Sequence, residues 1–452
     1  MKYLLYLNYR AFYSVIRWFL LHFSKPGLFV LIGVAASAVI GIDTRQTLAY
    51  QVFTFLLSIV TISIVCSIFF RGRFSVNRIL PKFGTAQSPL VYRVVIENQG
   101  RQVQKGLYLF DRQKDPRPDF ESFKTIEEPY EKSRNLFDRI MKYHRWKWLI
   151  EKKQYLLPED EYKKRPVDTL IPGISTEIKV EVVPCRRGRL NLTEMNIICP
   201  DPLGLFRAVK TIVAPNSIMI LPKRYKLPPI DLPGTRKHQS GGMALTESVG
   251  ESEEFVSLRD YRPGDPLHRI HWRSWAKTGK PVVKEYQKEF FVRHALVLDT
   301  FTEKKQHEVF EEAVSVAASF ACTVRTRESL LDLMFIGTKA YCFTSGRGLG
   351  NTSQTLELLA AVRPCTDKPF STLPPQVFSR VHMLSGCICV LIGWDKERQA
   401  FIEKLNGLGV SLKVILIEDE NMPFPGDMIK AGPGLEIIRL VTGKIQEGFS
   451  QL

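Results

Sequence analysis

The sequence predicts a multidomain protein with an N-terminal transmembrane helical hairpin, a β-sandwich-like domain with a helical insertion, and a C-terminal α/β domain. Three observations lead to this fold class. Two apolar runs, residues 28–42 and 48–70, lie close together near the N-terminus. Segments of alternating polar and apolar residues follow as far as residue 221. Beyond residue 293, apolar runs alternate with amphipathic stretches, as in α/β domains.

Residues 1–25 are predicted to form an interfacial amphipathic helix, because they are rich in apolar and aromatic residues. Arg10 and Arg17 are seven residues apart and would lie on similar faces of this helix. A signal peptide is the alternative. The two arginines argue against it because they interrupt the apolar region, and no small-residue cleavage site follows.

Residues 26–72 contain the two helices of the predicted hairpin. The second apolar run is long enough to span a bilayer, whereas the first is short and needs its flanks. Basic residues lie outside both ends of the pair: Lys2, Arg10, Arg17, Lys25, Arg71, Arg73, Arg78 and Lys82. The positive-inside rule then predicts a multi-pass protein of the inner (plasma) membrane with both termini cytoplasmic. Two buried helices of a soluble protein are the alternative.

The formal net charge of +17 is compatible with three kinds of partner, namely a membrane surface, nucleic acid or an acidic protein. Because cytoplasm-facing membrane proteins carry such an excess, we expect membrane lipid rather than nucleic acid. The eight cysteines form no CxxC pair, so their spacing does not indicate zinc.

Residues 73–221 are predicted to form the β-rich domain. Alternating stretches at residues 90–97 and 176–183 indicate strands that pair in an antiparallel sandwich or barrel. A charged, aromatic-rich stretch near residues 120–162 predicts a helical insertion, which would lie either on the membrane or on the sandwich. The proline- and glycine-rich residues 222–242 predict an extended and partly mobile linker.

Residues 293–452 predict an open, mainly parallel sheet with helices on both faces. Asp299 and Asp395 follow two of its strands, where a sheet of this kind places ligands, and together they could hold Mg²⁺. The region resembles a von Willebrand factor A domain, whose metal motif is Asp-x-Ser-x-Ser. Residues 299–303 read DTFTE, so both serine positions are lost. Helix capping is therefore the alternative role for these aspartates.

Residues 243–292 contain the densest cluster of polar and aromatic side chains. The stretch 254–286 reads EFVSLRDYRPGDPLHRIHWRSWAKTGKPVVKEY. Its Pro-Gly-Asp predicts a turn, and its arginines and carboxylates are expected to interlock. The residues expected to hold the fold or bind a partner are Glu254, Arg259, Tyr261, Gly264, Asp265, Arg269, Trp272, Lys277 and Lys284. The enzymatic alternative would use Ser274 as nucleophile and His271 as base.

This stretch resembles the motif of the bacterial family known as domain of unknown function 58, E-F-x-x-L-R-x-Y-x-x-G-D-x-x-R-x-I-x-W, followed by A-K-x-G and V-K-E. Residues 185–207, CRRGRLNLTEMNIICPDPLGLFR, resemble an upstream element of the same family. The resemblance implies a membrane-associated partner of MoxR-type AAA+ ATPases, often found alongside other membrane proteins. It does not account for the insertion at 120–162.

The sequence contains no GxSxG elbow, no HExxH helix and no phosphate-binding loop. We therefore expect a membrane-anchored, cytoplasm-facing scaffold or adaptor that is not an enzyme and has no cofactor. Two alternatives stay open: a metal-dependent protein-binding module that uses Asp299 and Asp395, and a hydrolase that uses the arginine- and histidine-rich motif. The sequence does not indicate an oligomeric state or the process served.

Overall fold

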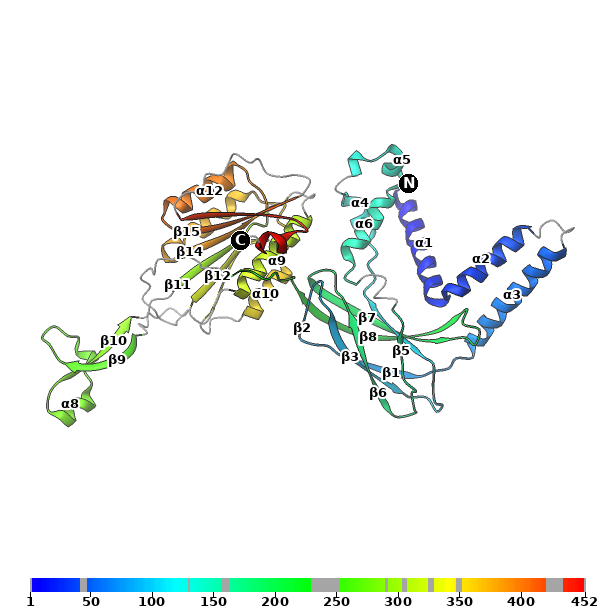
Figure 1. Cartoon of the computed structure of the whole chain (residues 1–452), viewed down its shortest axis with the longest axis horizontal. Coiled ribbons are helices and arrows are strands. Elements are labelled where there is room, and N and C mark those ends of the chain that lie inside the picture. Colours follow the sequence, from blue (N-terminus) through cyan, green and yellow to red (C-terminus); the bar gives the residue numbers. More distant parts are fainter. Residues whose placement is uncertain are drawn as a thin grey trace. The chain divides into compact units, whose positions relative to one another are not determined.

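The protein is multidomain, with mixed α/β content. The computed structural model describes residues 2–40, 47–128, 131–156, 163–228, 253–288, 292–302, 307–323, 329–346, 352–419 and 434–450. They fold into two compact units, Met1–Lys223 and Arg224–Leu452 (Figure 1). We describe each unit by itself.

Three helices open the N-terminal unit: α1 (Lys2–His22), α2 (Lys25–Ile40) and α3 (Thr47–Ile68). Among the described residues, Leu48–Ile68 in α3 is the helical segment that is long and apolar enough to cross a membrane. Helix α2 is apolar but shorter, and it lies alongside α3 (Figure 1). Helices α1 and α2 run in different directions from a sharp bend at Phe23 and Ser24 (Figure 1).

The β-rich part of this unit has two sheets. One sheet is antiparallel, with the order β1 (Phe74–Ile79), β3 (Leu90–Asn98) and β6 (Ser175–Val182). The other has the order β2 (Phe83–Thr85), β8 (Arg207–Leu221), β7 (Gly188–Pro200), β4 (Tyr108–Gln113) and β5 (Arg165–Pro166). Side chains from both sheets share one hydrophobic core, in which Val94, Leu109 and Leu190 are fully buried. The strands predicted at 90–97 and 176–183 are confirmed as β3 and β6.

A buried polar cluster links the two sheets. Arg78 on β1 donates from Nε to the Asp111 carboxylate on β4 over 2.9 Å, and Tyr92 on β3 donates to the same carboxylate over 2.5 Å. Arg78 also donates to the Glu194 carbonyl on β7 over 2.8 Å. The side chains of Arg78 and Asp111 are almost inaccessible to water, so their charges are compensated by each other rather than by solvent.

The predicted insertion is helical. It contains α4 (Phe120–Thr125), the 3₁₀ turn η1 (Glu131–Ser133), α5 (Leu136–Met141) and α6 (Tyr143–Lys153). Its aromatic side chains Phe123 and Trp146 pack against Tyr6 of α1 and bury it. Of the two placements expected for the insertion, neither includes this contact with the N-terminal helix.

The turn between β7 and β8 contacts the start of α2 and the second half of α3. The Ser24 amide donates to the Leu205 carbonyl over 3.0 Å, and the Ser24 hydroxyl donates to the Gly204 carbonyl over 2.6 Å. Ser63 on α3 donates to the buried carboxylate of Asp201 over 2.7 Å. Asp201 also accepts from the amides of Leu203 and Phe206. The Asp-Pro-Leu-Gly-Leu-Phe stretch is therefore the attachment point of α2 and α3 on the β-rich part.

The C-terminal unit is built on one six-stranded sheet. Its strand order is β13 (Ala340–Ser345), β12 (Ser329–Ile336), β11 (Val292–Leu298), β14 (Gly386–Leu391), β15 (Ser411–Glu418) and β16 (Leu435–Val441). All neighbours are parallel except β12 and β13, so the prediction of a mainly parallel sheet is confirmed.

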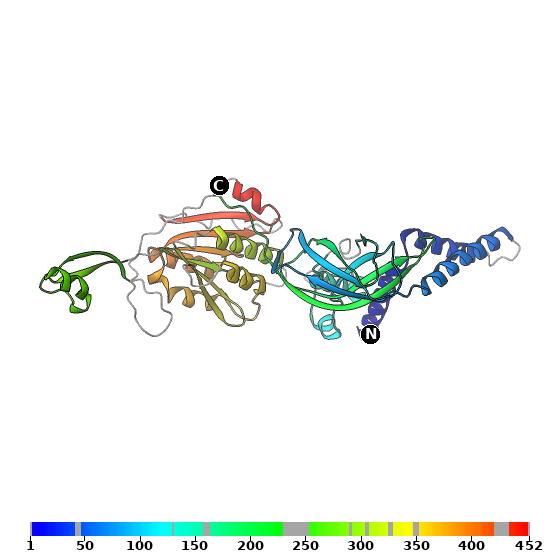
Figure 2. The same cartoon turned by 90° about the horizontal axis from the view of Figure 1, so that it is seen from below.

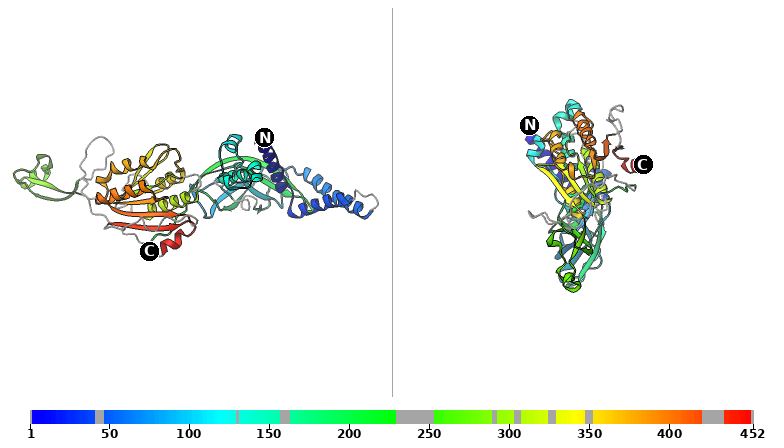
Figure 3. Two further views of the ribbon diagram at one scale, coloured as in Figure 1. Left: turned by 90° about the horizontal axis from the view of Figure 1, so that it is seen from above. Right: turned by 90° about the vertical axis from the view of Figure 1, so that its left-hand side faces the viewer.

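Helices cover both faces of this sheet (Figures 2 and 3). On one face, α12 (Lys396–Gly407) and the segment containing the 3₁₀ turns η3 (Phe370–Thr372) and η4 (Val381–Met383) and helix α11 (Pro374–Phe378) pack against Ala295 and Val297. The other helices are α9 (His307–Thr323), α10 (Thr352–Ala361) and α13 (Ile445–Ser450). The last five residues of β11, from His294 to Leu298, are all buried, because the strand is covered on both sides.

Part of the predicted linker is docked on this unit rather than free. Tyr225 is buried, its amide donates to the Ser319 hydroxyl on α9 over 2.8 Å, and its own hydroxyl donates to Glu312. The Lys226 amide donates to the Gln446 side chain on α13 over 2.9 Å. The beginning of the predicted linker is therefore held against α9, where Tyr225 buries apolar surface. The extended and partly mobile character of residues 222–242 stays a prediction. Residues 229–252 lie outside the described part of the chain.

Candidate functional site

The arginine- and tryptophan-rich motif forms a small folded element around two antiparallel strands, β9 (Glu253–Asp260) and β10 (Val282–Lys288). Residues 261–281 connect them through the 3₁₀ turn η2 (Leu267–Arg269) and helix α8 (Trp272–Thr278). Ile270 forms an isolated bridge with Val283, and both side chains are buried. The His271 amide donates to the Val282 carbonyl over 2.8 Å, which places the start of α8 on β10.

The Arg-Pro-Gly-Asp turn is stabilised by a bidentate ion pair. Both terminal nitrogens of Arg259 donate to the Asp265 carboxylate, over 2.8 and 2.7 Å. The same carboxylate accepts the Arg262 amide over 2.9 Å. These hydrogen bonds, first from Arg259 and then from Arg262, hold the pKa of Asp265 below its usual value. Gly264 has φ of 107°, a conformation that residues with a side chain rarely adopt, so glycine is required there.

The surface of this motif carries exposed apolar side chains. Trp272 is 62% exposed and Leu267 is 66% exposed, and Leu258 on β9 is also exposed. The rings of Trp272 and Trp275 stack, with centroids 5.3 Å apart and planes inclined by 20°. Large aromatic side chains held rigid at a surface are typical of protein-binding hot spots.

The other predicted residues of the motif lie as follows. Glu254 pairs with Gln287 in the strand register, and its side chain lies outside the described part of the structure. The Tyr261 amide donates to the Pro281 carbonyl over 3.0 Å, which joins the two ends of the segment that connects β9 and β10. Lys284 on β10 faces Leu258 across the register, Lys277 is exposed on α8, and Arg269 is half-buried in η2. The interlocking of charges that the sequence predicts is seen in the pair Arg259–Asp265.

His271 and Ser274 are in contact, as the enzymatic alternative requires. The histidine Nδ1 lies 2.6 Å from the serine hydroxyl. The two residues are one helical turn apart at the beginning of α8, which places both side chains on one face. Among the described residues, no carboxylate contacts His271, so the third member of a nucleophile–base–acid arrangement is absent from that part of the chain.

Asp299 and Asp395 are brought together, but through an arginine. Arg398 on α12 donates from Nε to the buried carboxylate of Asp299 over 2.7 Å, and it also contacts the carboxylate of Asp395. Its remaining nitrogen donates to the Phe301 carbonyl over 3.1 Å, and the guanidinium lies 4.7 Å from the centroid of the Phe370 ring.

Each aspartate has further partners. Asp299 accepts the amides of Phe301 over 3.0 Å and Ile392 over 3.3 Å. Asp395 is the N-cap of α12 and accepts the Arg398 amide over 2.9 Å. Burial raises the pKa of Asp299, and the charge and hydrogen bond of Arg398 oppose that rise. Ionisation of Asp299 therefore depends on Arg398.

These contacts do not fit a divalent ion. The position between the two carboxylates holds the guanidinium of Arg398, which supplies the compensating positive charge. Across the described residues, no cluster of three or more histidine, cysteine or acidic side chains is arranged for a metal. The arrangement favours an internal ion pair at this edge of the sheet. Sequence reasoning missed Arg398, because an arginine three residues after a capping aspartate is also typical of a solvent-exposed helix turn.

Comparison with known proteins bears on this same region. Residues 257–427 match the family model described as "Protein of unknown function DUF58". The chain contains a DUF58 domain. The match begins in β9 and extends past β15, so it includes both the arginine- and tryptophan-rich motif and the Asp299–Arg398 pair.

A curated relative extends the similarity beyond the DUF58 domain. It is the "Uncharacterized protein YeaD" of Bacillus subtilis (strain 168), 21% identical over 249 residues. The aligned region is 55% of this chain and 60% of that protein, so less than two thirds of the relative is spanned.

Two solved structures each align with about a third of the chain, at very low similarity. One is the CARDB domain of a Pyrococcus furiosus protein in complex with di-metal ions, at 11% identity and a TM-score of 0.18, covering 33% of this chain and 89% of that one. The other is a β-glucosidase from Erythrobacter marinus, at 15% identity and a TM-score of 0.14, covering 33% of this chain and 16% of that one. Scores this low support no conclusion about fold or function.

Proposed function

We propose that this DUF58 protein is a membrane-anchored, cytoplasm-facing scaffold or adaptor without enzymatic activity, and that its partner is a MoxR-type AAA+ ATPase. One observation carries the proposal: the exposed surface of Leu267 and Trp272 on a motif whose turn is fixed by the Arg259–Asp265 pair. A rigid aromatic surface costs little conformational entropy when a partner covers it, which favours binding.

The anchor in this proposal is the pair α2 and α3, which cross the bilayer as a hairpin. Support comes from the length and apolarity of Leu48–Ile68, and from side chains such as Phe29 and Phe55 that point away from the rest of the unit. By the positive-inside rule, the basic residues outside both helices support a cytoplasmic location for the β-rich part and the DUF58 domain.

In the same proposal the two sheets of the N-terminal unit form a β-sandwich, and the C-terminal sheet is a von Willebrand factor A-like domain that has exchanged its cation for Arg398. Support comes from the shared core of the two sheets and from the position of Asp299 directly after β11. Such a domain binds other proteins without a metal cofactor.

Co-purification tests the proposal directly. The full chain in nanodiscs is incubated with the endogenous MoxR-type ATPase, with and without ATP, and bound ATPase is measured. We expect enrichment by the wild type and its loss in a Leu267→Ala, Trp272→Ala double variant. Leu136→Ala is the matched control, because Leu136 is 73% exposed on α5 and belongs to the other compact unit. No enrichment by the wild type in either nucleotide state contradicts the ATPase as partner.

A second candidate function is a hydrolase, favoured by the 2.6 Å contact between His271 and Ser274. A fluorophosphonate probe, which reacts with activated serines, distinguishes the two proposals. Labelling of the wild type that disappears in Ser274→Ala supports the hydrolase and contradicts the scaffold. The metal-dependent binding module is tested by Mg²⁺ titration of the wild type, in which binding abolished by Asp299→Ala would support a cation at that site.

A further inference from the structure

Helix α1 carries its apolar side chains on the outside of the protein. The large apolar residues exposed along it are Tyr3, Leu4, Leu7, Phe12, Val15, Ile16, Trp18 and Leu20. At 100° per residue, Leu4, Leu7, Phe12, Val15, Ile16 and Trp18 fall within one broad stripe of the helix. A helix on the surface of a soluble protein has the opposite arrangement, with its apolar stripe toward the core.

Two tyrosine hydroxyls of α1 point toward the protein, whereas Asn8 is an exposed polar residue within the stripe. The Tyr6 hydroxyl donates to the Pro118 carbonyl over 3.3 Å, and the Tyr9 hydroxyl donates to the Met141 carbonyl over 2.8 Å. Tyr6 is buried against the aromatic side chains of the insertion. The inner face of α1 is therefore bound by residues 115–146. The apolar side chains of the outer stripe are 40–70% exposed, with Phe12 beside α5 and Trp18 beside Phe206.

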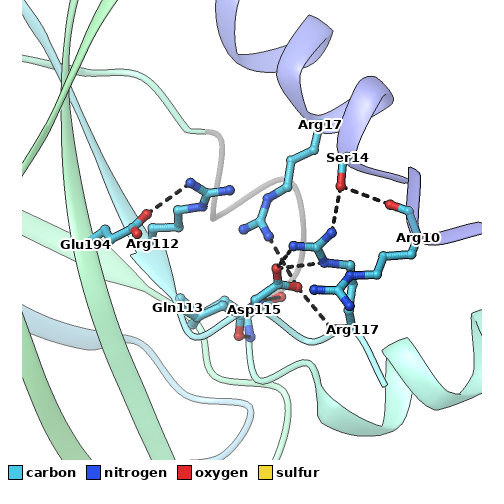
Figure 4. A network of polar contacts seen from close by, with 9 residues as sticks. Arg10, Ser14, Arg17, Arg112, Gln113, Asp115, Arg117 and Glu194 are labelled. Atoms are coloured by element: carbon cyan, nitrogen blue, oxygen red, sulfur yellow. Dashed lines mark hydrogen bonds and ion pairs between the residues drawn. The ribbon is translucent and has the colours of Figure 1, made fainter. Parts of the chain in front are cut away.

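Arg17 shows most clearly which way the helix is turned. This arginine is buried, and its guanidinium lies 3.6 Å from the Asp115 carboxylate (Figure 4). Arg117 contacts the same carboxylate over 2.6 Å and donates to the Ser14 hydroxyl over 2.6 Å (Figure 4). One turn of α1 is thus fixed by a charged network on the protein side, with its apolar residues facing away.

The outer stripe of α1 continues into the apolar helices. The chain bends at Phe23 and Ser24 and enters α2 directly, and Phe23 packs with Trp18 and Phe206 around that bend. Aromatic side chains such as Tyr3 and Trp18 are typical of the boundary between lipid headgroups and acyl chains. This continuity indicates which partner covers the stripe.

We propose that α1 lies in the cytoplasmic interface of the bilayer, with the stripe from Leu4 to Trp18 against the acyl chains and the helical insertion α4–α6 covering its cytoplasmic side. The inference rests on the membrane anchor of the proposed function and adds a second lipid-binding element to it. It also assigns a role to the insertion, which holds α1 flat through the Asp115 network and the Tyr6 cluster.

Site-specific photo-cross-linking tests this placement in the full chain. A benzophenone amino acid replaces Phe12 on the stripe, Phe55 on α3 or Val103 on the β-rich part, whose side chains are 60%, 65% and 50% exposed. The similar exposure makes the three positions comparable. Each variant is reconstituted in nanodiscs of phosphatidylcholine and phosphatidylglycerol and illuminated, and lipid adducts are measured by mass spectrometry.

The expected result is lipid adducts at Phe12 and Phe55, each at least about tenfold above the yield at Val103. Adducts at Phe55 without adducts at Phe12, or cross-links from Phe12 to a second copy of the chain, overturn the placement of α1 and leave the anchor standing. No lipid adduct at Phe55 contradicts the anchor itself. The experiment is repeated with the benzophenone amino acid at Val15, in case the substitution at Phe12 itself disturbs the helix. Both residues belong to the stripe, so a bound bilayer contacts both.

Discussion

Replacing Arg398 by alanine tests whether an internal arginine has taken the place of a cation in the C-terminal unit. The substitution removes the group that contacts Asp299, Asp395 and the Phe301 carbonyl. Asp299 is fully buried, so it is left either charged without a partner or protonated at the cost of its hydrogen bonds. Removing one partner of a buried ion pair typically costs about 3–5 kcal/mol.

Two control variants sharpen that magnitude. Asp395 is half-exposed, and asparagine at this position still accepts the Arg398 amide as an N-cap, so Asp395→Asn should cost about 1 kcal/mol or less. Arg398→Lys keeps the charge, but a single ammonium cannot reach Asp299, Asp395 and Phe301 together, so an intermediate loss is expected.

Hydrogen exchange in the full chain measures these costs locally. Strands β11 and β14 flank Asp299, and their amides report opening of this part of the sheet. A cost of about 3–5 kcal/mol corresponds to exchange that is roughly a hundred- to several thousand-fold faster in Arg398→Ala. An acceleration below about tenfold, or one no larger than that of Asp395→Asn, would refute the role assigned to Arg398.

Three further perturbations follow from the geometry. Gly264→Ala should open the Arg259–Asp265 turn more than Gly279→Ala does. The reason is that φ at Gly264 is 107°, whereas φ at Gly279 is 69°, within the left-handed helical region that costs alanine about 1 kcal/mol. Equal amide hydrogen exchange in the two variants would contradict this. Asp201→Ala should destabilise the N-terminal unit by about 2 kcal/mol, because the charge-assisted hydrogen bonds of this carboxylate are lost. The expected observation is a lower melting temperature in detergent. An unchanged melting temperature would show that Ser63 and the turn amides find other partners. Burial raises the pKa of Asp115, but Arg117 and Arg17 outweigh burial and the net pKa is lowered; its stabilising contribution is therefore complete above about pH 4 and is lost as pH falls through the lowered pKa. In Asp115→Asn this acid sensitivity should disappear from near-ultraviolet circular dichroism of the aromatic cluster, and an unchanged acid transition would exclude Asp115 as its origin.

The elements that the sequence predicts well are those whose side chains follow one simple rule. Strand β3 alternates buried and less buried residues along its whole length, as expected when one face of the sheet packs on the core. Strand β15 is buried almost throughout, as expected for a strand covered on both faces. The alternation or the apolar run is visible directly in the sequence. The α/β rhythm of the C-terminal unit follows for the same reason.

The sequence does not predict strand β4, because the buried positions of this strand include polar residues. Asp111 and Gln113 both point into the core, where Arg78, Tyr92 and backbone groups satisfy them. A period-two pattern that counts only apolar residues cannot recognise such a strand. The partners of Asp111 lie on other strands, so only the assembled sheet shows why a buried carboxylate is tolerated there.

The candidate site shows the same limit. The sequence indicates that Asp299 and Asp395 meet at one edge of the sheet, because each follows a strand. It does not indicate that Arg398 lies between them, since that depends on how α12 packs on the sheet. Likewise, Arg10 and Arg17 suggest one polar face on α1, but the acceptor that buries Arg17 is Asp115, far along the chain.

The division of the chain at Lys223 has a consequence for biosynthesis. All strands and helices of the first unit precede that residue, so none of them waits for a segment of the second unit. A ribosome would therefore release a complete β-rich part and its attached helices while the DUF58 domain is still being translated. Domains commonly fold as units during synthesis, in order from the N-terminus. The docking of the Asp201 turn on Ser24 and Ser63 could then be completed before the parallel sheet, whose distant strands pair slowly, begins to form.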